Sequence, residues 1–570
     1  MMEDFEELEL TQEDLAEIEN VEINLLNNSF QFSSDDEFNP SKKRRCRIIL
    51  PSDSEEDNDE SRVVPDLSGN TPASNSWYEP KGNQRNIIPF TETPGFPLRF
   101  RNSMTNKSAY EFFGLMVSDD ILQEIVECTN LFAIQKIASK EEVSKHARLR
   151  RWTPTDLAEI KQFFGILLFM GLVKISRLSD YWSTDEVLSH PYPRTIMSRN
   201  RFELLLQMLH FSRNDEANKS DRLHRIRNVL EMLNANYQEH YTPSEDLCID
   251  ESVIPFRGRI IFRQYNKQKR HKYGIKEFKL CTIPGYTYKV NVYGGKNDAT
   301  NTTPTNVVME LCRGLLNKGH TLYTDNWYTS IDLARKLLDN ETHLVGTLRK
   351  NRKHLPKSVV QKKLKKGEYI AKESEDGITV MKWRDKREVL VLSTKHSVRF
   401  HNVTKRGRII SKPQIIIDYN KGKGAVDLSD QMTSYCTPLR KSIKWYKKIA
   451  IDLLLNTSVV NALILYKTVT NDKMIQIVDF RRKLLSGLCQ KNEEALKRKM
   501  PQRLKHTLVK REGISRKSRR TCQQCYKAKS AIIGAKMAKN QAKKVVTYCS
   551  TCPNKPSLCL ECFNEVHLKL

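Results

Sequence analysis

The sequence has none of the features that direct a chain out of the cell or into a membrane. Residues Met1 to Asn20 are acidic and contain no basic segment followed by an apolar core, so no secretory signal is predicted. No apolar run approaches the roughly 18 residues that a membrane-spanning helix needs. An internal repeat of solenoid length is missing as well. We therefore expect several domains, because 570 residues exceed one ordinary core, and no membrane partner.

Cysteine is sparse and unpaired over most of the chain. Seven of the 13 cysteines stand singly between Cys46 and Cys489, and six form three C-x-x-C pairs near the C-terminal end. Single cysteines without a secretory signal are typical of a reducing compartment, where disulfides are rare. The three pairs are therefore predicted to bind metal, with a disulfide cluster as the alternative.

Acidic residues are too few to balance the basic ones. The formal net charge of +27 predicts a polyanionic partner, either nucleic acid or an acidic membrane face. The alternative is a basic protein that is merely soluble. The N-terminal tail, residues 1–96, is instead acidic and is expected to be disordered. It holds one basic cluster, which predicts nuclear import unless it is a stray solvated charge run: Lys42, Lys43, Arg44, Arg45 and Arg47.

Hydrophobic periodicity separates a helical region from a mixed one. From about residue 97 to 245 the spacing predicts helices over Ala109–Phe113, Asp119–Thr129, Thr155–Met170, Arg199–Phe211 and Val229–Tyr241. Strands are then predicted at Leu247–Ile249, Phe278–Thr282, Tyr286–Tyr293, Thr321–Thr324 and His343–Leu348, with helices at Thr305–Leu316 and Ile331–Leu338. Three antiparallel strands followed by alternating helix and strand predict an α/β domain with a mixed central sheet.

The amino-acid composition changes again in the next segment. Residues 352–413 are rich in lysine and arginine and contain short alternating strands, which predict a β-rich insertion. We expect a strand at Gln414–Asp418, a helix from Gly424, and a long helix with an apolar face over Ser442–Thr468.

Four aspartates stand where a metal site could form. Asp250 and Asp325 each follow a short apolar strand, and neighbouring strand ends of one sheet can bring two carboxylates to one ion. Asp427 and Asp430 are three positions apart, which places both on one face of a helix. Mg²⁺ prefers such oxygen ligands, and a pair of ions can activate a water or a 3′-OH for phosphodiester chemistry. A single aspartate after a strand is more often a turn or cap residue, but four in a chain of +27 favour metal-dependent chemistry.

Basic and aromatic side chains alternate after Asp250. Basic groups neutralise phosphates and aromatic rings stack on bases or sugars, so the segment predicts nucleic-acid binding. A solvated hairpin is the alternative. The residues are Arg257, Arg259, Arg263, Lys267, Lys269, Arg270, His271 and Lys272, interleaved with Phe256, Phe262, Tyr265 and Tyr273.

Several longer motifs, in one order along the chain, carry a resemblance to a known family. They are Asp250-Glu251-Ser252 with Phe256-Arg257-Gly258-Arg259, Lys272-Tyr273-Gly274-Ile275-Lys276, Tyr323-Thr324-Asp325-Asn326, Gly346-Thr347-Leu348-Arg349-Lys350-Asn351-Arg352, Asp418-Tyr419-Asn420, Gly424-Ala425-Val426-Asp427 with Asp430-Gln431, Lys444-Trp445 and Asn461-Ala462. From about residue 97 to the end, the sequence resembles the piggyBac transposase family.

The resemblance implies a multidomain α/β fold with an RNase H-like catalytic core. The core would occupy residues 247–351 and 414–436, interrupted by the β-rich insertion at 352–413. A helical dimerisation and DNA-binding domain would be assembled from residues 97–246 and 437–495. A basic linker with a cross-brace zinc module would occupy residues 496–570.

The resemblance also implies an activity. Asp250, Asp325 and Asp427 would hold two Mg²⁺ or Mn²⁺ ions, with Asp430 as an accessory carboxylate. The family nicks a transposon end with water, forms a hairpin by attack of the 3′-OH, and integrates at TTAA. The partners would be double-stranded DNA and a second copy of the chain, in the nucleus. The DNA contacts expected are Arg257, Arg259, Lys272, Lys276, Asn326, Arg349, Lys350, Arg352, Lys444 and Trp445.

The cysteine-rich tail offers enough ligands for two zinc ions. Six thiols and two imidazoles make two sets of four, and structural zinc is tetrahedral. By resemblance both histidines would be ligands, although His506 lies far upstream of the rest, and the module would bind transposon-end DNA. The ligands expected are His506, Cys522, Cys525, Cys549, Cys552, Cys559, Cys562 and His567.

Two other functions stay open at this point. One is a domesticated transposase-derived protein that binds specific DNA or chromatin without transposition. The other is a ubiquitin-pathway adaptor that uses the zinc module alone, although the tail lacks the C-x-H pair typical of that class.

Overall fold

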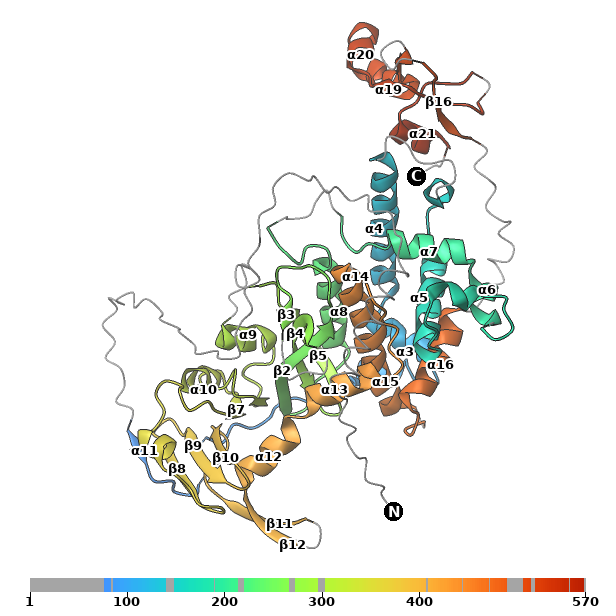
Figure 1. Cartoon of the computed structure of the whole chain (residues 1–570). Coiled ribbons are helices and arrows are strands. Elements are labelled where there is room, and N and C mark those ends of the chain that lie inside the picture. The colour runs from blue at the N-terminus through green and yellow to red at the C-terminus, as the bar shows by residue number, and fades with distance from the viewer. Residues whose placement is uncertain are drawn as a thin grey trace, which may run out of the picture. The chain divides into compact units, whose positions relative to one another are not determined.

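The largest sheet in the described residues is mixed and has ten strands. Most of these strands are labelled in Figure 1. The computed structural model describes residues 76–83, 86–139, 148–188, 190–213, 220–265, 272–295, 303–405, 408–442, 444–470, 472–489, 506–513, 518–552 and 554–567. Most of the acidic tail, including its basic cluster, lies outside the described residues, and so do residues 267–271 of the basic and aromatic segment.

The strand order combines neighbours that are distant in sequence. Along the sheet it is β1 (Trp77–Tyr78), β8 (Tyr369–Ser374), β9 (Thr379–Arg384), β10 (Glu388–Ser393), β7 (His343–Thr347), β6 (Thr321–Thr324), β2 (Asp246–Pro255), β4 (Tyr273–Thr282) and β3 (Gln264–Tyr265), and β5 (Tyr286–Val292) also pairs with β4. Strands β2, β6 and β7 run parallel, and the other pairs are antiparallel. The mixed sheet predicted from the alternation of elements is therefore confirmed.

Two parts of this sheet extend beyond what the pattern predicted. The expected insertion does not form a sheet of its own, because β10 pairs with β7 and so continues the central sheet. The last part of the expected tail is also structured, since Trp77 and Tyr78 pair with β8 and Gly95 bridges Thr242. The boundary of the tail is therefore earlier than residue 96. The hairpin of β11 (Phe400–Lys405) and β12 (Arg408–Pro413) forms a separate two-stranded sheet.

Helices cover both faces of the sheet, as the alternation of side chains along the strands requires. On one face, Leu322 and Leu344 pack with α9 (Pro304–Leu311) and α10 (Ile331–Leu338). On the other, Tyr323 and Val345 pack with α12 (Gln414–Gly422). The strand predicted at Gln414–Asp418 was wrong. Pro413 precedes a helix there, and a short apolar run does not by itself separate strand from helix.

The helical part is built from two distant segments of the chain. Helices α15 (Ser458–Val469) and α16 (Ile477–Leu488) pack against α3 (Ala109–Met116), and α16 also packs against α5 (Leu157–Leu172). The rest comprises α2 (Leu98–Arg101), α4 (Asp119–Ala138), α6 (Pro191–Ile196), α7 (Arg199–Met208), α8 (Arg227–Glu239) and α14 (Trp445–Asp452). Residues 175–188 group apart from this unit and hold a short 3-10 helix at Leu178–Trp182.

The long helix predicted over Ser442–Thr468 is interrupted by one wide turn. Residues Leu453–Thr457 form a π-helical segment between α14 and α15. Arg481, fully buried, donates to the Leu455 backbone oxygen at 2.9 Å and to Asn456 Oδ1 at 3.1 Å, and so supplies partners to this turn. In the described residues this stretch, Trp445–Val469, alone is long and apolar enough for a membrane span, and 94% of its most apolar 18-residue window is buried inside the protein, as in a core helix.

The C-terminal module is small and contains little apolar core besides its cysteines. It comprises β13 (Leu508–Lys510) paired with β16 (Thr547–Cys549), β14 (Arg520–Thr521) paired with β15 (Lys544–Val545), and the helices α19 (Gln523–Ile533), α20 (Ala535–Gln541) and α21 (Leu560–His567). Its buried cluster consists of four cysteines with Leu558 and Phe563. So small a core usually needs a metal or a disulfide to be stable.

Candidate metal centres

Asp250 and Asp325 each come directly after the last residue that pairs β2 with β6. Ile249 on β2 is opposite Thr324 on β6, so the two aspartates follow the last paired residues. Adjacent strands lie about 4.8 Å apart, which places the two side chains beside each other. The expected strand end at Asp250 was wrong, since β2 continues to Pro255 against β4. What ends at Asp250 is the pairing with β6.

The turn after β6 holds Asp325 in place. Asp325 Oδ1 accepts the backbone N–H of Trp327 at 2.8 Å, and the Asp325 carbonyl accepts the Thr329 hydroxyl at 2.7 Å. Two arginines from the loop after β7 secure the same turn. Arg349 Nε donates to Asn326 Oδ1 at 3.1 Å, and Arg352 donates to the backbone oxygens of Asn326 and Trp327. These two predicted DNA-contact residues therefore support the Asp325 turn.

Helix α13 (Ala425–Ser434) carries the other two aspartates and is fixed on the sheet by its first turn. Ala425 and Val426 pack on Cys248 and Cys281, and the Cys248 thiol donates to the Lys423 carbonyl at 3.1 Å. Cys248 lies two residues before Asp250 on β2. The helix thus begins against the strand that carries the first aspartate.

The two aspartates of α13 have different surroundings. Asp427 is exposed. Asp430 Oδ1 accepts both the Ser252 hydroxyl at 2.9 Å and the Lys279 ammonium at 3.0 Å. Ser252 and Lys279 belong to β2 and β4, so Asp430 ties the helix to both strands.

The carboxylates repel one another in the absence of a cation. Burial, together with the charges of Asp325, Glu251 and Asp427, raises the pKa of Asp250 to about 6, although a hydrogen bond from the Glu251 N–H opposes the rise. A cation is what relieves such repulsion. In the described part of the chain, the two C-terminal groups have ligand atoms that all lie within 4.8 Å of one another. The aspartates are not gathered as closely as that. A pair of ions about 3.5–4 Å apart does not require so tight a set.

Seven other residues were predicted to contact DNA, and four of them lie on β4 or on the segment between β2 and β4. Arg257, Arg259 and Lys272 are exposed on the segment between β2 and β4. Lys276 instead pairs with Glu251 and lies over the Trp327 ring, 4.5 Å from its centroid. It is therefore held beside the aspartates.

The remaining three lie on other elements. Lys350 pairs with Glu388 at 3.3 Å, and its side chain is 63% exposed. Lys444 is the residue before α14, whose first residue is Trp445. The Trp445 ring meets the Phe262 ring edge-on, with centroids 5.2 Å apart. This contact joins the helix to the basic and aromatic segment after β2.

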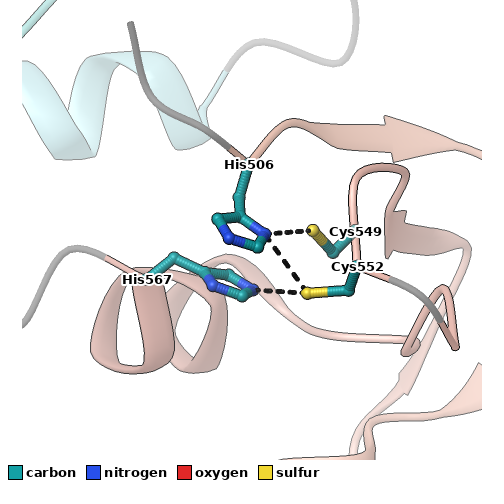
Figure 2. Close-up of side chains that lie close together, drawn as sticks. All are labelled: His506, Cys549, Cys552 and His567. Atoms are coloured by element: carbon teal, nitrogen blue, oxygen red, sulfur yellow. Dashed lines mark hydrogen bonds between the residues drawn. The ribbon is translucent and has the colours of Figure 1, made fainter. Parts of the chain in front are cut away.

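The C-terminal module gathers its eight predicted ligands into two groups of four. In the first group, His506 Nδ1 lies 3.5 Å from Cys549 Sγ and 3.2 Å from Cys552 Sγ, and His567 Nε2 lies 3.7 Å from Cys552 Sγ (Figure 2). Burial raises the pKa of Cys549, but hydrogen bonds from His506 and nearby amides outweigh it and lower the pKa to about 7. A thiol that ionises this readily is a good metal ligand.

The second group consists of cysteines alone. Cys525 Sγ lies 3.8 Å from Cys559 Sγ and 3.4 Å from Cys562 Sγ, and Cys522 completes the set. Tetrahedral zinc with bonds of about 2.3 Å to sulfur separates its sulfur ligands by about 3.8 Å. The spacing therefore fits zinc, and every cysteine in the described residues is free of disulfides.

The two groups interleave along the chain. His506, Cys549, Cys552 and His567 alternate with the pairs Cys522/Cys525 and Cys559/Cys562. This is the cross-brace arrangement that the resemblance implied. It includes His506, the ligand that lay farthest from the others in the sequence.

Sequence reasoning missed the buried charges next to the carboxylates. The side chains of Lys279 and Glu277 are 1% and 0% exposed. In the sequence they alternate with apolar residues, a pattern typical of a strand that has one face in solvent. The signal available was that Lys279 would lie opposite Asp250 once β2 and β4 pair.

Comparisons with known proteins show which family this chain resembles. A family model described as Transposase IS4 matches residues 108–463, which is more than half of the chain. PiggyBac transposable element-derived protein 3 of Homo sapiens is 26% identical over 396 residues, 66% of this chain and 64% of that protein. PiggyBac transposable element-derived protein 2 of Homo sapiens is 25% identical over 391 residues, 65% of this chain and 63% of that protein. The chain thus spans just under two thirds of the length of these relatives.

A solved structure matches over a longer part. The cryo-EM structure of a piggyBac transposase synaptic complex with hairpin DNA is 26% identical, with a TM-score of 0.61. The match covers 82% of this chain and 98% of that one.

Proposed function

Because this chain belongs to the piggyBac transposase family, we propose that it is a cut-and-paste DNA transposase. The observation that carries the proposal is the placement of Asp250 and Asp325 on neighbouring parallel strands, with helix α13 anchored beside them through Cys248. The sheet order, with three antiparallel strands followed by two parallel ones, supports an RNase H-like core.

Asp250, Asp325 and Asp427 are proposed to hold two Mg²⁺ or Mn²⁺ ions, with Asp430 as the accessory carboxylate. The raised pKa of Asp250 supports this, because burial and neighbouring carboxylates destabilise its ionised form and a bound cation would stabilise it. When bound, the ions would supply activation of a water or 3′-OH and stabilisation of the leaving oxygen. Glu251 and Lys276 neutralise each other at the border of this set.

The reaction proposed is nicking at the transposon end, hairpin formation on the opposite strand, and transfer into TTAA. The matched solved structure is a synaptic complex with hairpin DNA, which supports the same substrate here. Exposed Arg257, Arg259, Lys272 and Lys350, together with Lys444, would bind phosphates. Trp445, fixed against Phe262, would pack on the DNA, while Asn326, Arg349 and Arg352 would shape the turn at Asp325.

Two zinc ions are proposed to stabilise the C-terminal module, and the module to bind transposon-end DNA. The spacing of its ligand atoms supports zinc. A homodimer is proposed because the resemblance assigns the helical part, assembled from two chain segments, to the family's dimerisation and DNA-binding domain. Nuclear localisation is proposed as well, because the substrate would be genomic DNA and the sequence contains the basic cluster Lys42–Arg47.

The test uses full-length protein and a plasmid that carries the inverted repeats recovered from the genomic DNA on either side of the coding sequence. With Mg²⁺, we expect nicking and hairpin formation at the repeat ends. Asp250→Asn should lower the rate roughly a hundredfold or more, because a metal ligand is lost. Asp332→Asn, an exposed aspartate on α10, is the matched control and should leave the rate unchanged. Unaltered cleavage by the Asp250 variant would remove that residue from the mechanism.

The alternative is a domesticated DNA-binding protein without transposition. The names of the human relatives, transposable element-derived proteins, support it. Specific binding to genomic DNA without cleavage in either metal, together with a single-copy gene that lacks flanking repeats, would favour this function.

A further inference from the structure

Lys279 is a buried lysine next to the proposed catalytic carboxylates. Its side chain is 1% exposed, and β2–β4 pairing places Lys279 opposite Asp250. Its ammonium lies 3.0 Å from Asp430 Oδ1 and 3.7 Å from Glu277 Oε2. A buried charge is tolerated only with a partner of opposite charge.

Asp430 is the acid that provides this partner. Three carboxylates face Lys279: Asp430 from α13, Glu277 from its own strand, and Asp452 from α14. Burial alone would lower the pKa of Lys279, but these carboxylates outweigh it and raise the pKa. Glu277 lies farther from the ammonium, at 3.7 Å, and Asp452 accepts a hydrogen bond from the Asn456 side-chain amide at 2.7 Å. Asp430, at 35% exposure, makes the shortest contact.

The pair connects α13 to β2, the strand that carries Asp250, and to the neighbouring strand β4. Ser252, two residues after Asp250 on the same face of β2, and Lys279 on β4 both donate to Asp430 Oδ1. Asp427 is one helical turn before Asp430, so movement of Asp430 would carry Asp427 with it. Ser429, the neighbour of Asp430, adds a buried contact of 2.9 Å between its hydroxyl and that of Thr287.

We propose that Lys279 and Asp430 form a positioning pair that holds Asp427 beside Asp250, and that Asp430 acts through Lys279 rather than as a metal ligand. This inference rests on the proposed function, in which Asp250, Asp325 and Asp427 hold the ions. It assigns Lys279 a part in the site that composition and spacing did not reveal.

The test is a double-mutant cycle on the nicking rate with the repeat-bearing plasmid. Lys279→Met keeps the length of the side chain and removes its charge, and Asp430→Asn keeps an oxygen acceptor for Ser252. Each single variant should slow nicking roughly tenfold or more, because it removes one charge of the Lys279–Asp430 contact and leaves the other without this partner. The double variant removes both charges of the pair and should recover to within about threefold of wild type.

A metal ligand would behave differently. If Asp430 binds the ions, the double variant will be as slow as Asp430→Asn or slower, and that result overturns the proposal. Lys279→Arg, which keeps the charge, should retain most of the activity. Lys289→Met is the matched control, because it breaks the Lys289–Glu310 contact of 3.1 Å on the next strand, which does not involve α13. It should nick at the wild-type rate.

Two further measurements separate the possible failures. Melting temperatures and DNA binding in EDTA identify variants that do not fold. Electron paramagnetic resonance with Mn²⁺ alone then reports the ion site, and the double variant should bind Mn²⁺ about as well as wild type. A wild-type chain that neither binds Mn²⁺ nor nicks DNA refutes the proposed function. A competent wild type with an unrecovered double variant refutes only the positioning pair.

Discussion

The hydroxyl oxygens of Thr324 and Thr329 lie 2.8 Å apart beside Gly346 on the neighbouring strand. The two threonines flank Asp325 and close the turn that presents its carboxylate. A Cβ on Gly346 would lie 2.2 Å from Thr329 Oγ1 and 2.8 Å from the Thr324 carbonyl oxygen. The turn therefore depends on the absence of a side chain at position 346.

Gly346→Ala should therefore displace the Asp325 turn. We expect a loss of about 1–3 kcal/mol in the free energy of unfolding, as for other overpacked sites, and a nicking rate at least roughly tenfold lower. Urea denaturation and the plasmid assay measure the two effects. Gly114→Ala in α3, where the new Cβ meets nothing within 4 Å, is the control and should not destabilise the protein. Equal stability of the Gly346 variant and wild type would contradict the close packing described.

Arg352 should behave as a structural arginine and not as a phosphate contact. Arg352→Met removes the donor to the Asn326 and Trp327 carbonyls and should slow nicking more than it weakens DNA binding. The dependence of DNA affinity on salt should be almost unchanged. Arg259→Ala, at an exposed position, should instead reduce the salt slope by about one. A reversed pattern, measured by fluorescence anisotropy across salt concentrations, would assign Arg352 to the DNA.

The metal-free protein should gain stability when Asp250 loses its charge. The pKa of Asp250 is raised to about 6 in the folded state, against about 3.9 in an unfolded chain. The folded protein thus binds this proton more tightly than the unfolded chain does. The ionised Asp250 carboxylate therefore lowers the free energy of unfolding fully above about pH 6, and this loss disappears as the pH falls towards about 4. In EDTA at pH 7.5, Asp250→Asn should raise the free energy of unfolding by about 1–3 kcal/mol.

The same variant should differ little from wild type near pH 4, as measured by urea denaturation. Adding Mg²⁺ at pH 7.5 should stabilise wild type and not the variant, because only the intact acid set binds the ion. An Asp250→Asn protein that is less stable than wild type in EDTA at pH 7.5 would refute the repulsion argument.

The C-terminal module should contain two zinc ions whose binding is coupled. Metal analysis should find about two zinc per chain in wild type and about one or none in Cys525→Ser, because the ligand pairs interleave and loss of one ion loosens the other site. Cys489→Ser, outside both groups, should keep two. Wild-type protein without zinc, or with its module folded in the presence of a strong chelator, would contradict this expectation.

Helices and strands whose apolar residues recur with a regular spacing could be predicted from the sequence. Thr321–Thr324 and Ile331–Leu338 have the bounds that the pattern gave, because buried strands and amphipathic helices have distinct spacings. The helix at Gln414–Gly422 could not be separated from a strand, since its apolar run is short. The π turn at Leu453–Thr457 depends on Arg481, a residue from a later helix, and local sequence carries no sign of it.

Some residues of the candidate sites could likewise be predicted from the sequence, and others could not. Residue type and spacing singled out Asp250, Asp325 and the six cysteines of the module, because metals select particular donors. The family resemblance added His506 and His567 as ligands. The resemblance assigned Arg349 and Arg352 to DNA, whereas their contacts depend on how the loop after β7 meets the turn after β6. Lys279 was missed because burial of a charge is a property of the packed sheet.

The insertion strands β8–β10 lie in sequence between Asp325 and Asp427, which places the third carboxylate late in synthesis. A polypeptide that terminates between β10 and α13 would hold Asp250, Asp325 and the exposed basic segment, yet lack Asp427. Such a shortened product would also lack α15 and α16, which pack against α3, and both C-terminal ligand groups. Truncation in this interval would thus remove the third carboxylate and the packing of the helical part together.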